Sequence, residues 1–302
     1  MIGSHLVDRL LEQDLTVIGL DNLSTGQIGN LGDAMANDRF MFVEADVTDA
    51  RSLNRLGRVD RIFHLASPAS PADFETMPVA ILRAGSIGTM NVAETAIEHG
   101  ARLVVSSTSE VYGDPEVHPQ HESYLGNVHT MGPRSCYDES KRFTEAVVAT
   151  LVRHDGLDAG IARIFNTYGP RMRVNDGRVV PNFVMQALRG EPLTVQGDGS
   201  QTRSFCHVDD QVRGLLALMD SGELGPINIG NPDERSVLDL AKLIIELTHS
   251  TSPIDYRPLP QDDPTQRCPD ILLAEFRLGW RPMIGLREGL ATVVRYFRGT
   301  QA

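Results

Sequence analysis

The sequence predicts an α/β fold in which helices cover a doubly wound parallel sheet and a smaller α/β domain follows. The main observation is that short β-rich apolar runs alternate with helical patterns through the first half of the chain. One such pattern is a helix over residues 87–99, which Gly100 closes as a C-cap. The strands are expected at residues 17–20, 40–43, 61–65 and 103–105.

A second observation is that each predicted strand leads into small or polar residues. In open parallel sheets, ligands bind beyond the carboxyl ends of the strands. We therefore expect Asp21, Asp46, Ser67 and Thr108 to line one crevice. One such residue alone is usually a loop residue or a helix cap, but four successive strands share the feature.

The pattern loosens from about residue 166, where Gly and Pro become frequent and strands such as 193–195 stand alone. We assign residues 1–165 to the sheet domain and residues 166–302 mainly to the smaller domain. The apolar run 226–230 predicts a further strand, so a segment near residues 202–230 is expected to return to the first domain.

Composition and charge exclude several classes of protein. The net charge of −12 argues against a general nucleic-acid binder. No apolar run approaches the roughly 20 residues that span a bilayer, and no signal peptide is evident, so we expect a cytoplasmic protein without a membrane segment. An anionic ligand would need local arginines, and Arg171, Arg173 and Arg178 lie close together.

The cysteines and histidines show no metal-ligand pattern. Cys136, Cys206 and Cys268 are odd in number and far apart, which fits neither a disulfide framework nor a zinc site. The nine histidines have no ligand spacing either. We therefore expect no metal.

Tyr137 and Lys141 form the central chemical signal, because residues four apart lie on one face of a helix. The lysine ammonium is expected to lower the pKa of the tyrosine from about 10. The phenolate can then take a proton from a hydroxyl group as hydride leaves the carbon. This spacing also occurs by chance in many helices, but here residues 107–113 (STSEVYG) precede it and residues 163–170 (RIFNTYGP) follow it.

This trio resembles the extended short-chain dehydrogenases, which act on nucleotide sugars. Further segments make the chain similar to the UDP-glucuronate decarboxylases, and the similarity runs from Gly3 nearly to the C-terminus. The segments are 113–115 (GDP), 118–120 (HPQ), 126–128 (GNV), 134–139 (RSCYDE), 176–180 (DGRVV), 201–205 (QTRSF) and 262–264 (DDP).

The resemblance implies a Rossmann-like fold, NAD as the cofactor and a UDP-sugar as the substrate. NAD+ oxidises C4 of the glucuronate ring, which leaves the C5 carboxylate β to a ketone, so that carbon dioxide departs. Reprotonation at C5 and return of hydride to C4 give UDP-xylose. Members of the family usually pair through helices of the sheet domain, so a homodimer is expected.

The resemblance also assigns catalytic roles. Tyr137 is the base, Lys141 tunes it and holds the nicotinamide ribose, and Thr108 hydrogen-bonds the C4 oxygen. Ser109 and Glu110 lie near C5 and its carboxylate, although an isolated Glu at this place would more often be a helix-start carboxylate.

Four further residues are expected at the substrate. Arg267 meets it and takes part in decarboxylation, although family members usually follow this arginine with lysine where Cys268 stands here. Asn166 and Arg203 hold the UDP portion, and Arg83 matches a basic residue near the substrate.

The cofactor residues come partly from spacing. Asp21 follows Gly3 by close to the roughly 20 residues expected of the acid that binds the adenosine ribose, and an acid there favours NAD over NADP. The full expected set is Gly3, Asp21, Asn22, Ser24, Thr25, Gly26, Asp46, Val47, Leu65, Ser67, Tyr137, Lys141, Thr167 and Arg178. One departure concerns the sugar site, where Phe74 and Thr76 replace two tyrosines found in many members.

Three alternatives stay open. A nucleotide-sugar 4,6-dehydratase would need an acid where Ser109 stands, and a 4-epimerase would not need Glu110. A catalytically inactive nucleotide-sugar-binding protein on the same fold is the alternative from another class; intact Tyr137 and Lys141 argue against it.

The N-terminus departs from the Rossmann pattern. Residues Ile2, Leu6 and Leu10 predict the helix that normally follows a first strand and a glycine-rich turn. Gly3 matches the third glycine of the family's Gly-x-x-Gly-x-x-Gly, while the first strand and the first two glycines are absent. We therefore expect a working enzyme to start upstream of Met1.

Overall fold

The computed structural model describes residues 1–259 and 266–301. Its main sheet is parallel and has the strand order β10-β5-β4-β3. These strands are β3 (Arg61–His64), β4 (Arg102–Thr108), β5 (Ala159–Ile164) and β10 (Ile227–Ile229). The chain thus returns to the main sheet after the smaller domain has begun, because β10 lies beside β5.

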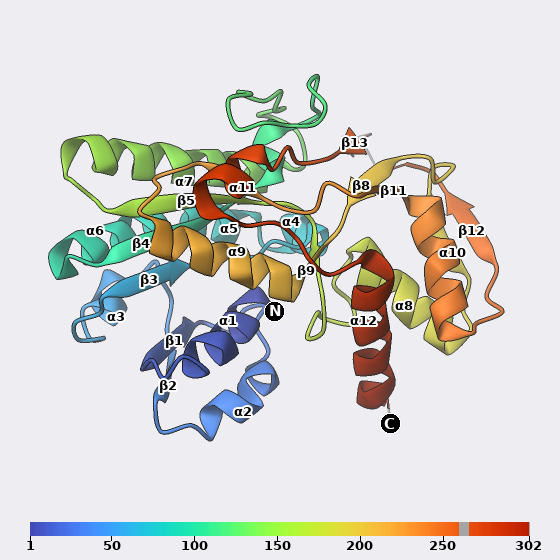
Figure 1. Cartoon of the computed structure of the whole chain (residues 1–302), viewed down its shortest axis with the longest axis horizontal. Helices are drawn as coiled ribbons and strands as arrows, with labels where there is room; N and C mark the ends of the chain where they lie inside the picture. Colours follow the sequence, from blue (N-terminus) through green and yellow to red (C-terminus); the bar gives the residue numbers. More distant parts are fainter. Residues whose placement is uncertain (260–265, 302) are drawn as a thin grey trace.

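Helices cover both faces of this sheet (Figure 1). On one face lie α6 (Thr89–His99) and α7 (Ser135–His154), and on the other lie α9 (Val208–Ser221) and α11 (Leu272–Leu278). The central strand β4 shows why both faces must be covered. Leu103 and Val105 pack toward α6 and α7, while Val104 packs toward α9, and all three are fully buried.

The N-terminal elements lie beside the main sheet and pack against its helices α6 and α9. They are α1 (Ile2–Leu11), β1 (Val17–Asp21), η1 (Ile28–Leu31), α2 (Gly32–Met35), β2 (Phe40–Glu44) and α3 (Ala50–Leu53). β1 pairs in parallel with β2, and among the described strands neither of them joins β3. The parallel strands therefore make two sheets, and the edges of β1 and β3 line the same cavity.

The segment between β3 and α6 contains three successive helical pieces. It comprises α4 (Pro71–Thr76), α5 (Pro78–Arg83) and a π-helical turn, η2 (Ala84–Gly88). Gly85 in this turn packs so closely on α7 that an added Cβ would lie 2.7 Å from the Ser140 Cβ. This contact sets the distance between η2 and the helix that carries Tyr137.

The second half of the chain is irregular, as the sequence predicts. It contains β6 (Thr167–Tyr168), α8 (Val179–Arg189), β7 (Leu193–Gln196), β8 (Thr202–Ser204), β9 (Cys206–His207), β11 (Glu234–Ser236), α10 (Val237–Thr248), β12 (Ile254–Arg257), β13 (Gln266–Arg267) and α12 (Leu286–Gln301). Its small sheets have the orders β11-β8-β13, β12-β7 and β6-β9. A core between α8, α10 and α12 holds this part together.

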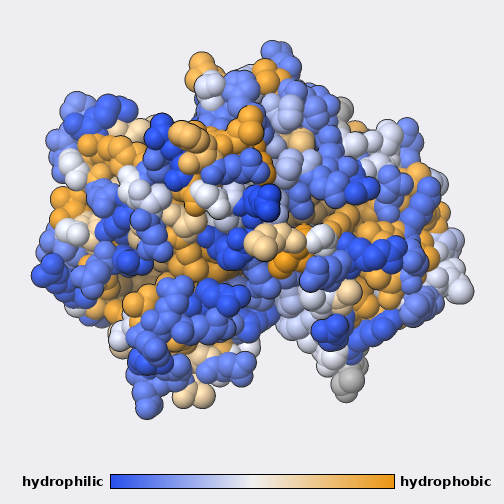
Figure 2. Space-filling model, in the orientation of Figure 1, coloured by the Kyte–Doolittle hydropathy of each residue, from blue (hydrophilic) through white to orange (hydrophobic). Residues whose placement is uncertain are grey.

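The surface is notched at its lower edge, between the unit that contains α1 and α2 and the part that ends in α12 (Figures 1 and 2). Within the described residues, no helix is both long and apolar enough to cross a membrane.

Candidate active site

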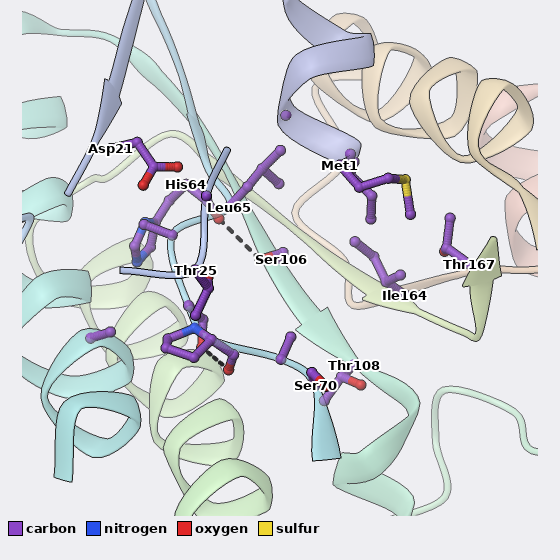
Figure 3. Close-up of a pocket in the computed structure, with 18 of the residues that line it drawn as sticks. Met1, Asp21, Thr25, His64, Leu65, Ser70, Ser106, Thr108, Ile164 and Thr167 are labelled. Carbon is purple, nitrogen blue, oxygen red and sulfur yellow. Dashed lines mark hydrogen bonds between the residues drawn. The ribbon is translucent and has the colours of Figure 1, made fainter. Parts of the chain in front are cut away.

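A cavity of about 1690 Å³ lies at the carboxyl ends of the parallel strands. Asp21, Asp46, Ser67 and Thr108 all line it, so the crevice expected from the strand ends is present. In Figure 3, His64, Leu65 and Ser106 lie between Asp21 and Thr108. The remaining predicted site residues also line this cavity: Gly3, Asn22, Ser24, Thr25, Gly26, Val47, Leu65, Arg83, Ser109, Glu110, Tyr137, Lys141, Asn166, Thr167, Arg178, Arg203 and Arg267.

One end of the cavity is built from the loop after β1. The Asp21 carboxylate accepts a 2.8 Å hydrogen bond from the Leu23 amide, and Asn22 donates one of 2.9 Å to Asp46. A Cβ at Gly26 would lie 3.0 Å from both carboxylate oxygens of Asp21. The glycine therefore lets the loop close around the Asp21 carboxylate, whose remaining lone pairs can accept hydrogen bonds from a ribose diol.

The other end is built by α7, which places Tyr137 and Lys141 on one face. The buried Lys141 Nζ donates a 2.8 Å hydrogen bond to the backbone oxygen of Ser106, at the end of β4. It lies 5.9 Å from the centre of the Tyr137 ring. Burial lowers the pKa of Lys141 to about 8, because the charged form loses its hydration.

The predicted lowering of the Tyr137 pKa was wrong for this arrangement. Burial raises the pKa of Tyr137 to about 12, and the negative charge of Glu110 acts in the same direction. A hydrogen bond with Thr108 and the charge of Arg178 oppose this rise without cancelling it. Desolvation is the largest influence on the phenol and therefore decides the direction in which its pKa moves.

Glu110 lies between two arginines at the start of η3 (Ser109–Tyr112). Arg134 Nη2 donates to Glu110 Oε2 at 2.7 Å, and Arg267 Nη1 donates to Glu110 Oε1. Burial opposes ionisation, but the charges of Arg267 and Arg134 outweigh it and lower the pKa of Glu110 to about 2. Glu110 is therefore a carboxylate at neutral pH and a poor proton donor.

Gly113 makes the Arg267 contact possible. Its backbone has φ +64°, and a Cβ there would lie 1.9 Å from the Asn127 oxygen, so no other residue fits. The Gly113 carbonyl accepts a 3.2 Å hydrogen bond from Arg267 Nη2. The Nε of Arg267 is buried without a hydrogen-bond partner among the described residues, which leaves a donor for a ligand.

The other predicted arginines differ in their surroundings. Arg178 pairs with Asp176 at 3.3 Å and donates to the Ala69 oxygen, and Arg203 on β8 donates to the Thr202 oxygen. Arg171 and Arg173 pair with acids as well, at 2.6 Å and 2.7 Å. Carboxylates of the chain therefore already neutralise much of the charge of Arg171, Arg173 and Arg178.

The structure separates the two residues that stand in place of tyrosines. Phe74 lines the cavity and stacks on Tyr137, with ring centroids 5.0 Å apart and 19° between the planes. Thr76 is exposed and donates to the Ala72 oxygen within α4. Only Phe74 can therefore influence the sugar site directly.

Sequence reasoning gave no role to three residues that build the site. Arg134 pairs with Glu110, Ser106 receives the Lys141 hydrogen bond, and the buried His64 lines the cavity. Burial lowers the pKa of His64 to about 3, so it is neutral. Of these three residues, only Arg134 could have been found from the sequence, because it lies in the motif at 134–139. The motif at 262–264 lies outside the described residues.

The residues present fit a dinucleotide at both ends of the cavity. Asp21 and the tight Gly26 approach suit the adenosine ribose, and Lys141 with Tyr137 suits the nicotinamide ribose and ring. The N-terminus of α1 faces the same cavity through Met1, Ile2 and Gly3. The free backbone N–H groups and the dipole at a helix N-terminus favour binding of a phosphate group.

Comparisons with known proteins agree with this geometry. The model of the NAD dependent epimerase/dehydratase family matches residues 1–230. The chain therefore belongs to the NAD dependent epimerase/dehydratase family.

Within this family, the chain is similar in sequence to UDP-glucuronic acid decarboxylases. UDP-glucuronic acid decarboxylase 3 of Arabidopsis thaliana is 50% identical over 298 residues, covering 98% of this chain and 86% of the relative. UDP-glucuronic acid decarboxylase 1 of Danio rerio is 47% identical over 296 residues, covering 98% and 70%. Among solved structures, a UDP-glucose 4-epimerase from Thermotoga maritima with UDP-glucose has a TM-score of 0.93 at 34% identity, covering 100% of this chain and 97% of that one.

Proposed function

We propose that this chain is an NAD-dependent decarboxylase that converts UDP-glucuronate into UDP-xylose. The relatives that are 47% and 50% identical to it are UDP-glucuronic acid decarboxylases. The observation that carries the proposal is the position of Arg267, a buried guanidinium that lines the cavity together with Tyr137 and Thr108. A carboxylated sugar needs such a cation beside the base that starts its oxidation.

Tyr137 and its neighbours carry the proton chemistry. The phenol hydrogen-bonds Thr108, so both groups can converge on one sugar oxygen. When bound, NAD would supply the acceptor for the C4 hydride and return that hydride after decarboxylation, and its positively charged ring would favour the phenolate of Tyr137. Tyr137 then holds the proton from the C4 hydroxyl, and Lys141 holds the ribose.

Decarboxylation depends on the carboxylate lying near Arg267. A ketone at C4 makes the C5 carboxylate a β-keto acid, whose carbon dioxide leaves to give an enolate. The unpartnered Nε of Arg267 can orient this carboxylate, while Arg134 keeps Glu110 ionised beside it. Asn166 and Arg203 are then left to hold the uridine diphosphate, with Arg83 at the rim of the cavity.

The geometry disfavours the two enzyme alternatives. A 4,6-dehydratase must protonate a leaving hydroxyl, but Ser109 is a poor acid and the pKa of Glu110 is about 2. A 4-epimerase remains the second candidate because of the fold match to the UDP-glucose 4-epimerase. An epimerase, however, gains nothing from a buried Arg267–Glu110–Arg134 cluster at the sugar.

Incubation of the purified protein with UDP-glucuronate, followed by mass analysis, tests the proposal. We expect a product lighter by one carbon dioxide that co-elutes with UDP-xylose. A product of unchanged mass would indicate epimerisation, and the same assay with UDP-glucose would test that directly. Bound NAD without any turnover of either sugar would favour the catalytically inactive binding protein.

We also propose that two chains pair through the helices α5, η2, α6 and α7. Large apolar side chains are exposed along this segment: Val79, Leu82, Ile87, Met90 and Phe143. Light scattering should give the mass of a dimer for the native chain and of a monomer for Leu82→Glu.

The cytoplasmic location stays a prediction.

A further inference from the structure

A cluster of three potential metal ligands lies outside the catalytic cavity. His118 comes from the loop after η3, Glu234 begins β11 and Cys268 follows β13. Their ligand atoms all lie within 4.8 Å of one another, and His118 Nε2 is 3.2 Å from Glu234 Oε2. None of the three residues lines the large cavity.

We propose that this cluster binds a divalent transition metal ion of the zinc class. Imidazole nitrogen, carboxylate oxygen and thiolate sulfur are the three ligand types that zinc takes in proteins. Bond lengths of about 2.0 to 2.3 Å in a tetrahedron place ligand atoms roughly 3.3 to 3.5 Å apart. The His118–Glu234 separation of 3.2 Å is close to this range, and a small movement of the thiol would complete the set.

The residues around the cluster hold the ligands in ligating positions. Thr202 Oγ1 donates a 2.5 Å hydrogen bond to Glu234 Oε1, which leaves Oε2 directed at His118. Such an outer partner orients a metal-binding carboxylate. Cys268 has a free thiol, which lies 3.5 Å from the backbone oxygen of Pro232 and also interacts with the Ser204 side chain.

The fully buried Gln120 fixes the Cys268 backbone. The backbone N–H of Gln120 donates to the backbone oxygen of Cys268, and the backbone N–H of Cys268 donates to Gln120 Oε1, both at 2.9 Å. The same segment carries His118, so two of the three ligands are held together before any metal arrives. His118 is exposed, which leaves the fourth coordination position open to water.

Metal at this place would join three separate segments of the chain, and one of them carries Arg267 of the catalytic cavity. Arg267 immediately precedes Cys268 and pairs with Glu110 in the cavity. The ion would therefore restrain the strand that presents Arg267. The inference does not rest on the proposed reaction, because none of the three ligand residues lines the cavity that is assigned to the sugar and the dinucleotide.

Cobalt titration tests the proposal. Chelator-treated protein is titrated with Co²⁺, and a cobalt–thiolate charge-transfer band is followed in the near ultraviolet. We expect the band to saturate at one equivalent and to disappear when Zn²⁺ displaces the cobalt. Cys268→Ser should abolish the band, while Cys136→Ser should keep it.

Two further variants keep the test valid if the cysteine variant fails to fold. His118→Asn and Glu234→Gln should each weaken cobalt binding by more than about tenfold, since even an outer partner contributes that much. His249→Asn, at a distant exposed histidine, is the matched control and should bind as the native chain does. Absence of the band, or an unchanged band in Cys268→Ser, would overturn the proposal, whatever the turnover of UDP-glucuronate.

Discussion

Replacement of Arg134 by Met is the sharpest test of the electrostatic account of the site. The variant removes the 2.7 Å hydrogen bond to Glu110 and half of the positive charge that faces this carboxylate, while Met fills much of the space. A buried ion that loses its only partner costs about 3–5 kcal/mol. Arg267 still pairs with Glu110, so we take the smaller value of about 2 kcal/mol for one charge-assisted hydrogen bond.

This loss corresponds to a modest, measurable change in Tm. Unfolding entropy of about 2.1 cal/mol/K per residue gives roughly 0.6 kcal/mol/K for a chain of this length, so Tm should fall by about 3 °C. The matched control is Arg287→Met, whose pair with Glu246 has similar distances of 2.8 and 3.0 Å but is 59% and 64% exposed. Its Tm should change by less than about 1 °C.

The pH dependence supplies a second readout. Burial opposes ionisation of Glu110, but the arginines hold its pKa near 2, below the ordinary 4.5. The stabilisation is therefore complete above pH 4.5 and is lost as the pH falls toward 2. The difference in Tm between the native chain and Arg134→Met should shrink across this window. Calorimetry that finds equal Tm values at pH 7, or equal losses for Arg134→Met and Arg287→Met, would refute the reasoning.

The other predictions concern the base, the cofactor, helix packing and a buried acid. Tyr137→Phe should lose at least 100-fold in kcat, on the order expected for general-base catalysis, yet bind the sugar with similar Kd; unchanged turnover would remove Tyr137 as base. Asp21→Ser should weaken NAD binding about tenfold and admit NADP, as fluorescence titration with both can measure. Gly85→Ala places its Cβ 2.7 Å from Ser140 Cβ and should cost about 1–3 kcal/mol in urea unfolding. Burial raises the pKa of Asp138 to about 7 from 3.8, so stability is lost as the pH rises through this range; Asp138→Asn should raise Tm at pH 8 but not at pH 4, and equal effects at both would contradict the assignment.

The sequence alone predicted the parallel strands and a set of site residues that all line the cavity. The strands and the crevice at their ends follow from local rules: alternation of apolar runs gives strands, and the carboxyl ends of parallel strands meet at one edge. Most of the site residues came from the family resemblance. The spacing of Tyr137 and Lys141 places them on one helix face wherever the helix lies. The position of Asp21 at the end of β1 follows from the same kind of local pattern.

Only the tertiary structure decided how these groups are charged and paired. Burial depends on every element around a side chain, so it raised the pKa of Tyr137 where the neighbouring lysine alone predicted a fall. The pairing of Glu110 with Arg267, and the meeting of His118 with Cys268, join segments far apart in the chain. No periodicity encodes such contacts, because they arise only when packing brings separate strands and loops to one place.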